Sequence, residues 1–461
     1  MRKQGTGPIS PVASLSLFLF TVLFLAGCTP ASYRAEKVKE EIASIAEKEY
    51  GIRQCDVRIN GTTLGVFLPL DQLFAMDFKE AILSGQVTDM EQLFQPTEKA
   101  IDRIEDMLFS MSRVMLSTDK KIDFYYLQAA DTEKTGMEMM FLGASDDVKK
   151  VRFWDIPRSE YRKRLIYEIQ LNRPILWHRP VRKFFADLNT MTRQELKPRY
   201  FKGQEDVKWM KEFYFEDATG YPLERAQASW EILDIRSLVL QDRQVVVYAK
   251  TRVTPKGAKI PPETPEYLFH VSVDGEKEKI TRIIPMAMMA SAFDDPSFPM
   301  NRDMILKSLD RWDTEFNVPD MTTGEFLALQ LTRRIQMLIG QDERIYNTFS
   351  GVKVMLKYEP SKPCHYSLYM TAPSKDIRQK VYSATGGINA DVIYLWELAA
   401  REFADVLHGY GYKDWDYLMF FLSQTKSYSW RASREDLELF RRKKKSLQDT
   451  LVLTTSRDTA A

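Results

Sequence analysis

The chain has 461 residues, of which 44% are hydrophobic, 12% aromatic and 28% charged, a composition typical of globular rather than disordered proteins. Its 65 basic and 64 acidic side chains leave a formal net charge of +1. The chain therefore has no overall field to attract nucleic acid, and we expect no nucleic-acid partner. At roughly 100–200 residues per domain, the length predicts about two to four domains.

The first 27 residues have the layout of a secretory signal peptide. Arg2 and Lys3 place positive charge at the start, and the run Ala13–Leu25 is apolar and uncharged. This run is shorter than the roughly 20 apolar residues that a membrane-spanning helix needs. The small residues expected at a cleavage site follow directly, in the sequence Leu25-Ala26-Gly27-Cys28.

This tetrapeptide, Leu25-Ala26-Gly27-Cys28, resembles the lipobox of bacterial lipoproteins. The resemblance implies that the Cys28 thiol carries a diacylglycerol, that the chain is cut just before it, and that the new amino group is acylated. Residues 1–27 are then the signal peptide, and residues 28–35 form a lipidated tether. Thr29 rather than aspartate follows the cysteine, which in double-membrane bacteria implies an outer-membrane anchor and a periplasmic body. The alternative is an uncleaved anchor with an incidental cysteine.

Two further cysteines, Cys55 and Cys364, each precede a strand-like run. Because Cys28 is assigned to lipid, they are the only two left to pair with each other. Disulfides persist outside the cytoplasm, so Cys55 and Cys364 either form one or remain as semi-buried thiols.

Residues 36–172 are predicted to form an N-terminal α+β domain. An apolar stripe favours a helix over Glu36–Tyr50, with Gly51 as its C-terminal cap. Asn60-Gly61 indicates a two-residue hairpin turn, and Pro69 is expected to end the strand that returns from it. The other expected elements are a helix at Thr97–Leu116 and strands at Lys121–Ala129, Gly136–Gly143, Val148–Ile156 and Tyr161–Asn172.

The middle of the chain is predicted to hold a connector and a β domain. Residues 173–204 contain three prolines and many basic side chains, which favours a connector with at most a short helix at Arg182–Asn189. Residues 205–290 are predicted to form an antiparallel β domain, opening with a short helix or strand at 205–217. Its four β-rich runs are Trp230–Gln241, Gln244–Val253, Glu266–Asp274 and Ile280–Ile284.

Residues 291–432 are predicted to form a C-terminal α+β domain. Thr322 and Glu325 fit a capping box at the start of a helix. A hairpin over Val352–Tyr358 and His365–Met370 is expected next, followed by a helix at Asp391–His408 that Gly409 closes. Residues 433–461 are expected to form a basic helix and a frayed tail.

Two stretches, Thr97–Phe153 and Thr322–Tyr382, share a plan of amphipathic helix, strand, turn, strand and charged segment. The C-terminal domain is therefore a candidate repeat of the first. The alternative is that helix-plus-hairpin units recur independently in α+β domains. A repeated module favours a binding or scaffolding role, because a catalytic site needs only one copy of its residues.

No motif assigns catalytic, cofactor-binding or metal-ligating residues. The histidines and cysteines lack the spacing of a zinc site, and there is neither a Gly-x-Ser-x-Gly elbow nor a phosphate-binding glycine loop. Ser117–Lys120 and Lys134-Thr135-Gly136 are similar to motifs of penicillin-binding enzymes in form alone. Ser117 falls at the end of a predicted helix and the Lys-Thr-Gly sequence in a hairpin turn. These absences favour a non-enzymatic role without a cofactor.

The segment Trp177–Lys183 is the strongest local concentration of positive charge. Arg179, Arg182 and Lys183 are candidates for contact with anionic lipid head groups, peptidoglycan or an acidic partner. The same holds for Arg441–Lys445. In both segments the alternative is an ordinary solvated face.

The sequence therefore predicts an α+β protein in which helix-plus-hairpin modules at both ends flank an antiparallel β-rich middle domain. We expect an envelope lipoprotein, held at the membrane by the lipid on Cys28, with a non-enzymatic scaffold, assembly or partner-binding role toward another envelope protein. Two alternatives stay open. One is a periplasmic carrier of a hydrophobic or small ligand, with the β-rich domain as its cup, and the other is an enzyme whose site no motif marks.

Overall fold

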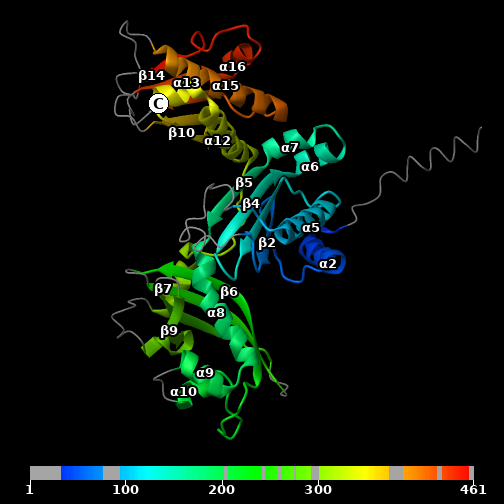
Figure 1. The fold of residues 1–461 in the computed structure, drawn as a ribbon, viewed down its shortest axis with the longest axis vertical. Coiled ribbons are helices and arrows are strands. Elements are labelled where there is room, and N and C mark those ends of the chain that lie inside the picture. The colour runs from blue at the N-terminus through cyan, green and yellow to red at the C-terminus, as the bar shows by residue number, and fades with distance from the viewer. Residues whose placement is uncertain are drawn as a thin grey trace, which may run out of the picture.

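The computed structural model describes residues 33–75, 94–201, 206–240, 244–256, 261–274, 277–291, 301–372, 388–422 and 428–455. Within these residues the fold is α+β, and an all-antiparallel middle sheet is flanked in the sequence by two mixed sheets. Figure 1 shows three bodies along the long axis of the molecule, and the body that comes first in the chain lies between the other two. We call them the N-terminal module (residues 33–171), the middle module (173–312) and the C-terminal module (322–455).

The N-terminal module consists of one five-stranded sheet and its helices. Its elements are η1 (Ala35–Lys37), α2 (Val38–Tyr50), β1 (Asp56–Asn60), β2 (Thr63–Leu70), α5 (Glu98–Met115), β3 (Phe124–Asp131), β4 (Met137–Ala144), α6 (Ser145–Arg152), α7 (Arg158–Arg164) and β5 (Ile166–Leu171). The strands follow one another in chain order, with β2 and β3 parallel and the other neighbours antiparallel. Two parallel neighbours need a crossover, and α5 lies on it.

Both faces of this sheet are buried. Helices α2 and α5 cover one face, whose core includes Leu64 and Leu127. The other face, which carries Phe67 and Tyr126, belongs to the core of the C-terminal module. Strand β3 is consequently buried along its whole length, as expected for a strand covered on both faces.

The predicted end of α2 is confirmed, as are both ends of α5 to within one residue, whereas α2 begins at Val38 rather than at Glu36. Gly51 caps α2 in the left-handed conformation, with φ of 67°, which glycine adopts without a Cβ clash. At the start of α5 the Thr97 hydroxyl accepts a hydrogen bond from the Ala100 N–H at 3.1 Å. A glycine or a capping side chain within a few residues determines each of these two ends, which is why the sequence predicts them.

The β1–β2 hairpin turns one residue later than predicted. Asn60 pairs with Thr63, so the two turn residues are Gly61 and Thr62. Of these only Gly61 has a positive φ, of 55°. A single glycine therefore satisfies the turn, and Asn60 stays in the strand.

The prediction that Pro69 ends β2 is wrong, because the strand continues to Leu70. The neighbouring β1 is shorter, and its last pair joins Asp56 to Phe67. Pro69 therefore pairs only with β3, and its missing N–H breaks no bond to β1.

Of the two strands predicted after β4, the first is wrong and the second correct in part. Val148–Ile156 overlaps helix α6, and Tyr161–Asn172 is divided between α7 and β5. The buried residues of α6 are Ser145 and Asp147, which are polar. No apolar stripe therefore marks this helix in the sequence.

The middle module is a four-stranded meander with α8 lying across one face (Figure 1). Its elements are α8 (Arg173–Thr190), α9 (Arg193–Tyr200), α10 (Asp206–Glu212), β6 (Ala228–Val239), β7 (Gln244–Pro255), β8 (Glu266–Asp274), β9 (Lys277–Pro285), η2 (Met286–Ser291), α11 (Arg302–Ser308) and η3 (Leu309–Arg311). The four predicted strands are confirmed in the order β6-β7-β8-β9. Phe184 of α8 contacts Phe269 of β8 and four rings from the helical part of the module, namely Phe185, Tyr200, Phe201 and Phe213.

The predicted connector, residues 173–204, forms helices α8 and α9 instead. Its prolines suggest a break, and Pro180 does lie inside α8. Burial of Phe184 and Phe185 against the sheet, at roughly 1.5–3 kcal/mol for each side chain, offsets the roughly 3 kcal/mol that an internal proline costs.

The C-terminal module has the same sheet topology as the N-terminal one. Its elements are α12 (Thr323–Gln341), α13 (Glu343–Phe349), β10 (Lys353–Glu359), β11 (His365–Thr371), α15 (Ala390–Tyr410), β12 (Tyr417–Leu422), β13 (Tyr428–Ser433), α16 (Arg434–Arg441) and β14 (Val452–Thr455). The strands again follow chain order, with β11 and β12 parallel and the other neighbours antiparallel. The capping box is confirmed, since the Thr322 N–H donates to Glu325 at 2.7 Å and the Glu325 N–H to the Thr322 hydroxyl at 3.3 Å.

The two outer modules share one topology, but their corresponding elements differ from those that the sequence comparison matches. Matching Thr97–Phe153 with Thr322–Tyr382 pairs α5 with α12. By position in the sheet, the counterpart of α5 is α15, which lies on the parallel crossover. Each module contains two consecutive helix-plus-hairpin units. The sequence comparison matches the second unit of the N-terminal module with the first unit of the C-terminal module. Residues 373–382 of that comparison lie outside the described part of the chain.

The longest helices are amphipathic rather than apolar throughout. Helix α15 buries Trp396 and Phe403 but also carries Arg401 and Glu402. Among the residues that the structure describes, no helix is both long and apolar enough to cross a bilayer.

Residues 313–320, which we call the strap, run from the middle module across the N-terminal sheet to α12. At the start of the strap, the backbones of Asp313 and Ser237 exchange two hydrogen bonds of 2.8 and 2.9 Å. Further on, the Asn60 side chain donates to the Val318 carbonyl at 2.9 Å. The strap therefore bonds to both modules before the C-terminal module begins.

We expect Gly65→Ala to destabilise the protein, because the strap lies directly on Gly65. A Cβ there would meet Val318 Cγ2 at 2.2 Å and Phe316 Cζ at 3.1 Å. Overpacking of this kind lowers the free energy of unfolding by roughly 1–3 kcal/mol, which urea denaturation followed by tryptophan fluorescence measures. Gly340→Ala in α12 is the control, because no atom lies within 4 Å of the added carbon. Equal urea midpoints for the two variants would contradict the close approach.

Candidate functional site

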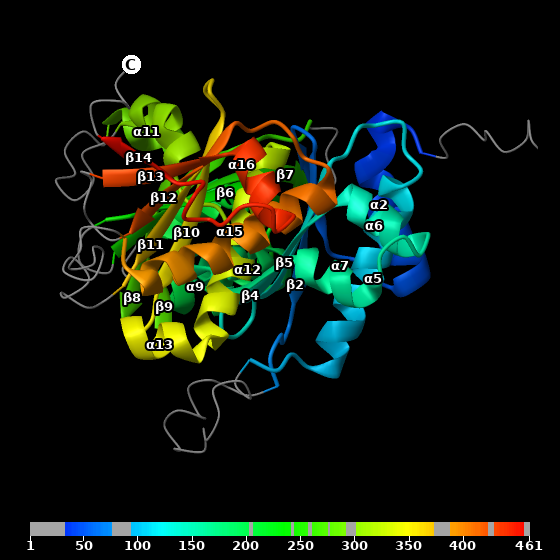
Figure 2. The same cartoon turned by 90° about the horizontal axis from the view of Figure 1, so that it is seen from above.

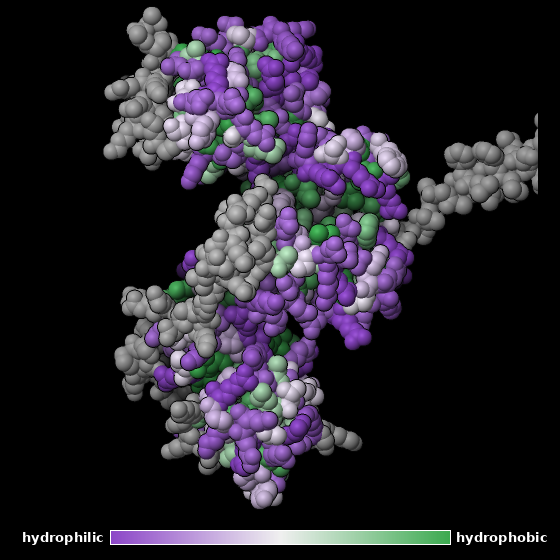
Figure 3. Space-filling view, in the orientation of Figure 1, coloured by the Kyte–Doolittle hydropathy of each residue, from purple (hydrophilic) through white to green (hydrophobic). Residues whose placement is uncertain are grey.

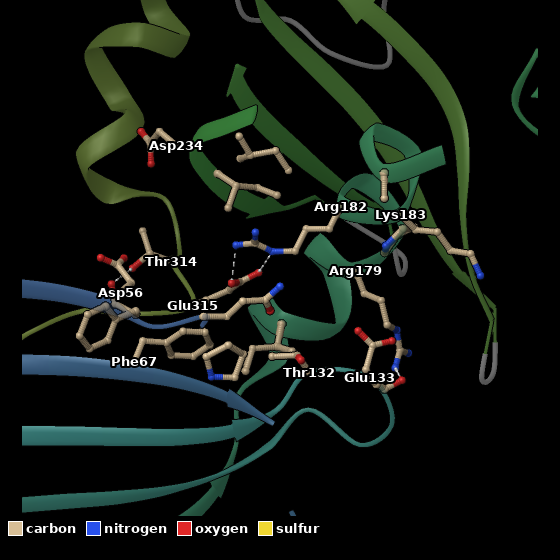
Figure 4. A pocket seen from close by; sticks show the side chains of 18 of the residues that line it. Asp56, Phe67, Thr132, Glu133, Arg179, Arg182, Lys183, Asp234, Thr314 and Glu315 are labelled. Atoms are coloured by element: carbon tan, nitrogen blue, oxygen red, sulfur yellow. Dashed lines mark hydrogen bonds and ion pairs between the residues drawn. The ribbon is translucent and has the colours of Figure 1, made fainter. Parts of the chain in front are cut away.

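A cleft of about 1740 Å³ separates the N-terminal and middle modules. Its lining includes residues 53–56 and 58 at the start of β1, residues of α8 between Ile175 and Ala186, residues 231–236 of β6 and residues 278–280 of β9. Figure 4 shows this region, with Arg179, Arg182 and Lys183 of α8 on one side and Asp56 and Phe67 of the N-terminal sheet on the other. The cleft is therefore formed by two modules together.

Eight basic and six acidic side chains line the cleft. Five of the acidic side chains are in ion pairs: Asp56 with Arg58, Glu231 with Arg252, Asp234 with Arg236, Glu278 with Arg179, and Glu315 with Arg182. The exposed cations Arg53, Lys183 and Lys279 have no ion-pair partner within the described part of the chain. The charge left available to a ligand is thus mainly positive.

Glu315 of the strap lies at the base of the cleft and is buried. Its carboxylate is 2.9 Å from His178 Nδ1 and accepts two hydrogen bonds from Arg182, at 3.0 and 2.7 Å. Burial acts to raise the pKa of Glu315, but the charge of Arg182 and the contact with His178 outweigh it and hold the pKa at about 2. The carboxylate is consequently charged at neutral pH although it is buried.

The backbone carbonyl of Glu315 is held by Gln128 of the N-terminal module and by Asn172, the residue between the N-terminal and middle modules. The side-chain amides of Gln128 and Asn172 donate to it at 2.5 and 2.7 Å. The same two amides, with that of Gln170, also donate to the Glu138 carboxylate at 2.6–2.7 Å. Burial raises the pKa of Glu138, and these three amides oppose the shift.

The carboxylates of Glu138 and Glu315 are bonded to other side chains of the same chain. Glu138 is 1% exposed and does not line the cleft. Glu315 does line it, but both carboxylate oxygens are already hydrogen-bonded. The arrangement joins the modules and supplies no obvious general acid or base to a bound molecule.

The structure places all three sequence-predicted basic residues, Arg179, Arg182 and Lys183, on the cleft wall. Arg179 forms a bidentate pair with Glu278, at 3.1 and 2.9 Å, and Arg182 pairs with Glu315. Lys183 alone of the three is exposed without an ion-pair partner among the described residues. The sequence identifies the basic cluster but does not indicate that two of its members join parts of the same chain.

The structure records Cys55 and Cys364 as free thiols. Cys55 precedes β1 in the N-terminal module, whereas Cys364 precedes β11 in the C-terminal module and donates to the Pro360 carbonyl at 3.2 Å. The two cysteines therefore lie in different modules and are not joined in the structure. Cys28 lies outside the described residues.

The remaining sequence motifs form no second site. Lys134-Thr135-Gly136 is the β3–β4 turn, where the Lys134 N–H and the Thr135 hydroxyl both donate to the Asp131 carboxylate. Within the described ranges no three or more His, Cys, Asp and Glu side chains are grouped so that they could hold a metal ion.

No family model matches the sequence, and no curated protein or solved structure matches it. No residue role is therefore carried over from another protein. Support for a function comes from the geometry of the chain itself.

We expect Glu315→Gln to lower the free energy of unfolding by roughly 1–3 kcal/mol at neutral pH, because a neutral amide replaces the buried carboxylate that His178 and the half-exposed Arg182 contact. The folded-state pKa of about 2 lies below the ordinary 4.5. The stabilisation is therefore complete above pH 4.5 and is lost as the pH falls toward 2. Urea unfolding of wild type and variant across this window measures the difference.

Glu231→Gln is the matched control for this experiment. Glu231 also lines the cleft, but its side chain is 64% exposed and pairs with a half-exposed Arg252. Such a pair contributes roughly 0–1 kcal/mol. A difference for Glu315→Gln that does not change between neutral and acid pH would show that the ion pair is not its cause.

Proposed function

We propose that the protein is a membrane-tethered binding protein of the bacterial envelope, anchored by lipid on Cys28, and that it is not an enzyme. Its cleft between the N-terminal and middle modules binds an extended acidic segment of another envelope protein. The observation that carries this proposal is the excess of free cations beside an open strand edge.

The charge of the cleft supports an anionic ligand. Arg53, Lys183 and Lys279 are exposed on its lining and lack ion-pair partners among the described residues, whereas most of the acidic groups are paired. A ligand carboxylate placed among these cations exchanges water for charge-assisted hydrogen bonds. Complementary charge of this kind raises both specificity and association rate.

The edge of β1 supports an extended polypeptide. β1 is an outer strand of its sheet, and Asn60 and Thr63 flank the two-residue turn. The backbone groups of Asn60 and of every second residue before it therefore point to β2, and those of Val57 and Ile59 point away. No described residue bonds to these outward groups. An extended segment can add to such an edge as a further strand.

The alternatives have less support in the described residues. A carrier needs a hollow inside the meander, but aromatic side chains such as Phe184 and Tyr267 fill its covered face. An enzyme needs titratable groups directed into the cleft, whereas Glu138 and Glu315 are occupied by partners within the chain. The face in Figure 3 is mostly hydrophilic, so no broad apolar patch favours a flat scaffold contact there.

We expect Cys28→Ser to abolish incorporation of radiolabelled fatty acid and to release the protein from the membrane fraction. The thiol is the attachment atom, and serine does not replace it in the lipidation that the resemblance implies. Cys55→Ser is the control and should retain the label. Wild-type protein that never carries the label, or that is found full length in the cytosol, would refute the anchor.

We expect Lys183→Glu combined with Lys279→Glu to weaken binding of a fluorescent oligoglutamate peptide about tenfold or more, since two attractive charges become repulsive. Fluorescence anisotropy measures the affinity, which should fall as salt is raised. Lys353→Glu, at an exposed position on β10, is the control and should bind like wild type.

A photo-crosslinking amino acid at position 183 tests the same surface in intact cells. It should give adducts with an acidic segment of an envelope protein, and the same probe at position 353 should not. Wild-type protein that fails to bind the peptide, or equal affinities for all variants, would contradict the proposal.

A further inference from the structure

The loop between α6 and α7 exposes two adjacent aromatic side chains. Phe153 is 71% exposed and Trp154 is 84% exposed, the highest values among the exposed large hydrophobic residues described. Neither ring contacts another aromatic ring in the described part of the chain. Large apolar side chains that stand free in pairs mark an interaction site more often than singly scattered ones do.

The backbone holds this pair at the end of α6 at some cost. The Trp154 N–H donates to the Val151 carbonyl, and the Asp155 N–H donates to the Lys150 carbonyl at 2.8 Å. This pattern is a Schellman motif, whose left-handed position usually takes glycine. Trp154 occupies that position, with φ of 65°. A tryptophan that is both strained and exposed is poorly explained by stability, so we look for its use in binding.

Free basic side chains outnumber free acidic ones on α6 and α7, the two helices that flank the aromatic pair in the sequence. Between residues 145 and 164 the acidic residues Asp146, Asp147 and Glu160 are in ion pairs, and Asp155 is exposed. The exposed basic residues that have no ion-pair partner among the described residues are Lys149, Arg152, Arg158, Arg162 and Lys163. In this segment the exposed cations without an ion-pair partner therefore outnumber such carboxylates by five to one.

The loop lies on the same side of the molecule as the start of the described chain. The Tyr33 N–H donates to the carbonyl of Ser117, two residues beyond the end of α5, and the Ser145 hydroxyl at the start of α6 contacts Met115 of α5. In both Figure 1 and Figure 2 the blue start of the chain and the α6–α7 loop lie on one side. A surface that approaches the attachment point of the chain can therefore also approach the loop.

We propose that the α6–α7 loop is a second membrane contact, in which Phe153 and Trp154 enter the head-group region of an anionic bilayer and the surrounding cations bind its head groups. Tryptophan prefers this region because its ring is apolar and its N–H is polar. Basic residues next to an inserted aromatic side chain add attraction to anionic lipid.

The short tether fits this orientation. From Cys28 to Tyr33 there are five residues, which span about 17 Å when fully extended. This point rests on the proposed lipid at Cys28, whereas the exposure and charge of the loop do not. A body tethered so closely must present some face to the bilayer, and the loop is on the side of the tether.

Vesicle flotation of residues 29–461 tests the loop without the lipid anchor, and this chain keeps every element described. We expect it to bind vesicles of phosphatidylethanolamine and phosphatidylglycerol more tightly than vesicles of phosphatidylcholine. Phe153→Ser combined with Trp154→Ser should lower the partition coefficient about tenfold or more. Arg158→Glu combined with Arg162→Glu should lower it to a similar extent and weaken its dependence on salt.

Two further variants separate membrane binding from folding. Tyr221→Ser removes an aromatic side chain that is 69% exposed in the middle module, and it should bind vesicles like wild type. Trp154→Gly should raise the midpoint of thermal unfolding by about 1–3 °C and yet reduce vesicle binding. The proposal is overturned if the wild-type chain does not bind anionic vesicles, or if removal of both aromatic side chains leaves binding unchanged.

Discussion

Glu315 is held from two sides. His178 and Arg182 of α8 contact its carboxylate, and Gln128 of the N-terminal module donates to its carbonyl together with Asn172, which joins that module to α8. A buried carboxylate stays charged only where such partners compensate for the water it has lost. Because the donors come from different modules, their simultaneous engagement determines how the middle module sits against the N-terminal one. The shape of the cleft follows, since each module supplies one of its walls.

The N-terminal module is the structural centre of the molecule. One face of its sheet packs on its own helices, and the other face packs on the strap and on α12. A second interaction, between modules at opposite ends of the chain, joins Arg164 and Asp147 to Tyr410. The two repeated sheets are therefore joined through a shared core, and the meander is attached through the strap and Glu315.

The parts of the fold that the sequence predicts are those that neighbouring residues determine. Thr97, Gly51 and the Thr322–Glu325 pair act within one helical turn, and their helices begin or end as expected. Helix α8 is not predicted from the sequence, because its prolines disfavour a helix locally. The aromatic packing that outweighs them involves elements distant in the sequence. The same is true of Glu315, which lies 137 residues from His178 and 143 from Asn172. The basic cluster of α8 is visible in the sequence, but the carboxylates that pair with it are not.

The position of the strap in the sequence determines when the second face of the N-terminal sheet can be covered during synthesis. Phe316 covers the N-terminal sheet from a position 258 residues beyond Arg58, which holds its carbonyl. All strands of the N-terminal sheet are thus synthesised long before the residues that cover its second face leave the ribosome. Until then Phe67 and Tyr126 are open to chaperones, or to proteases if synthesis stops. A chain truncated before the strap accordingly keeps this apolar face of the sheet exposed.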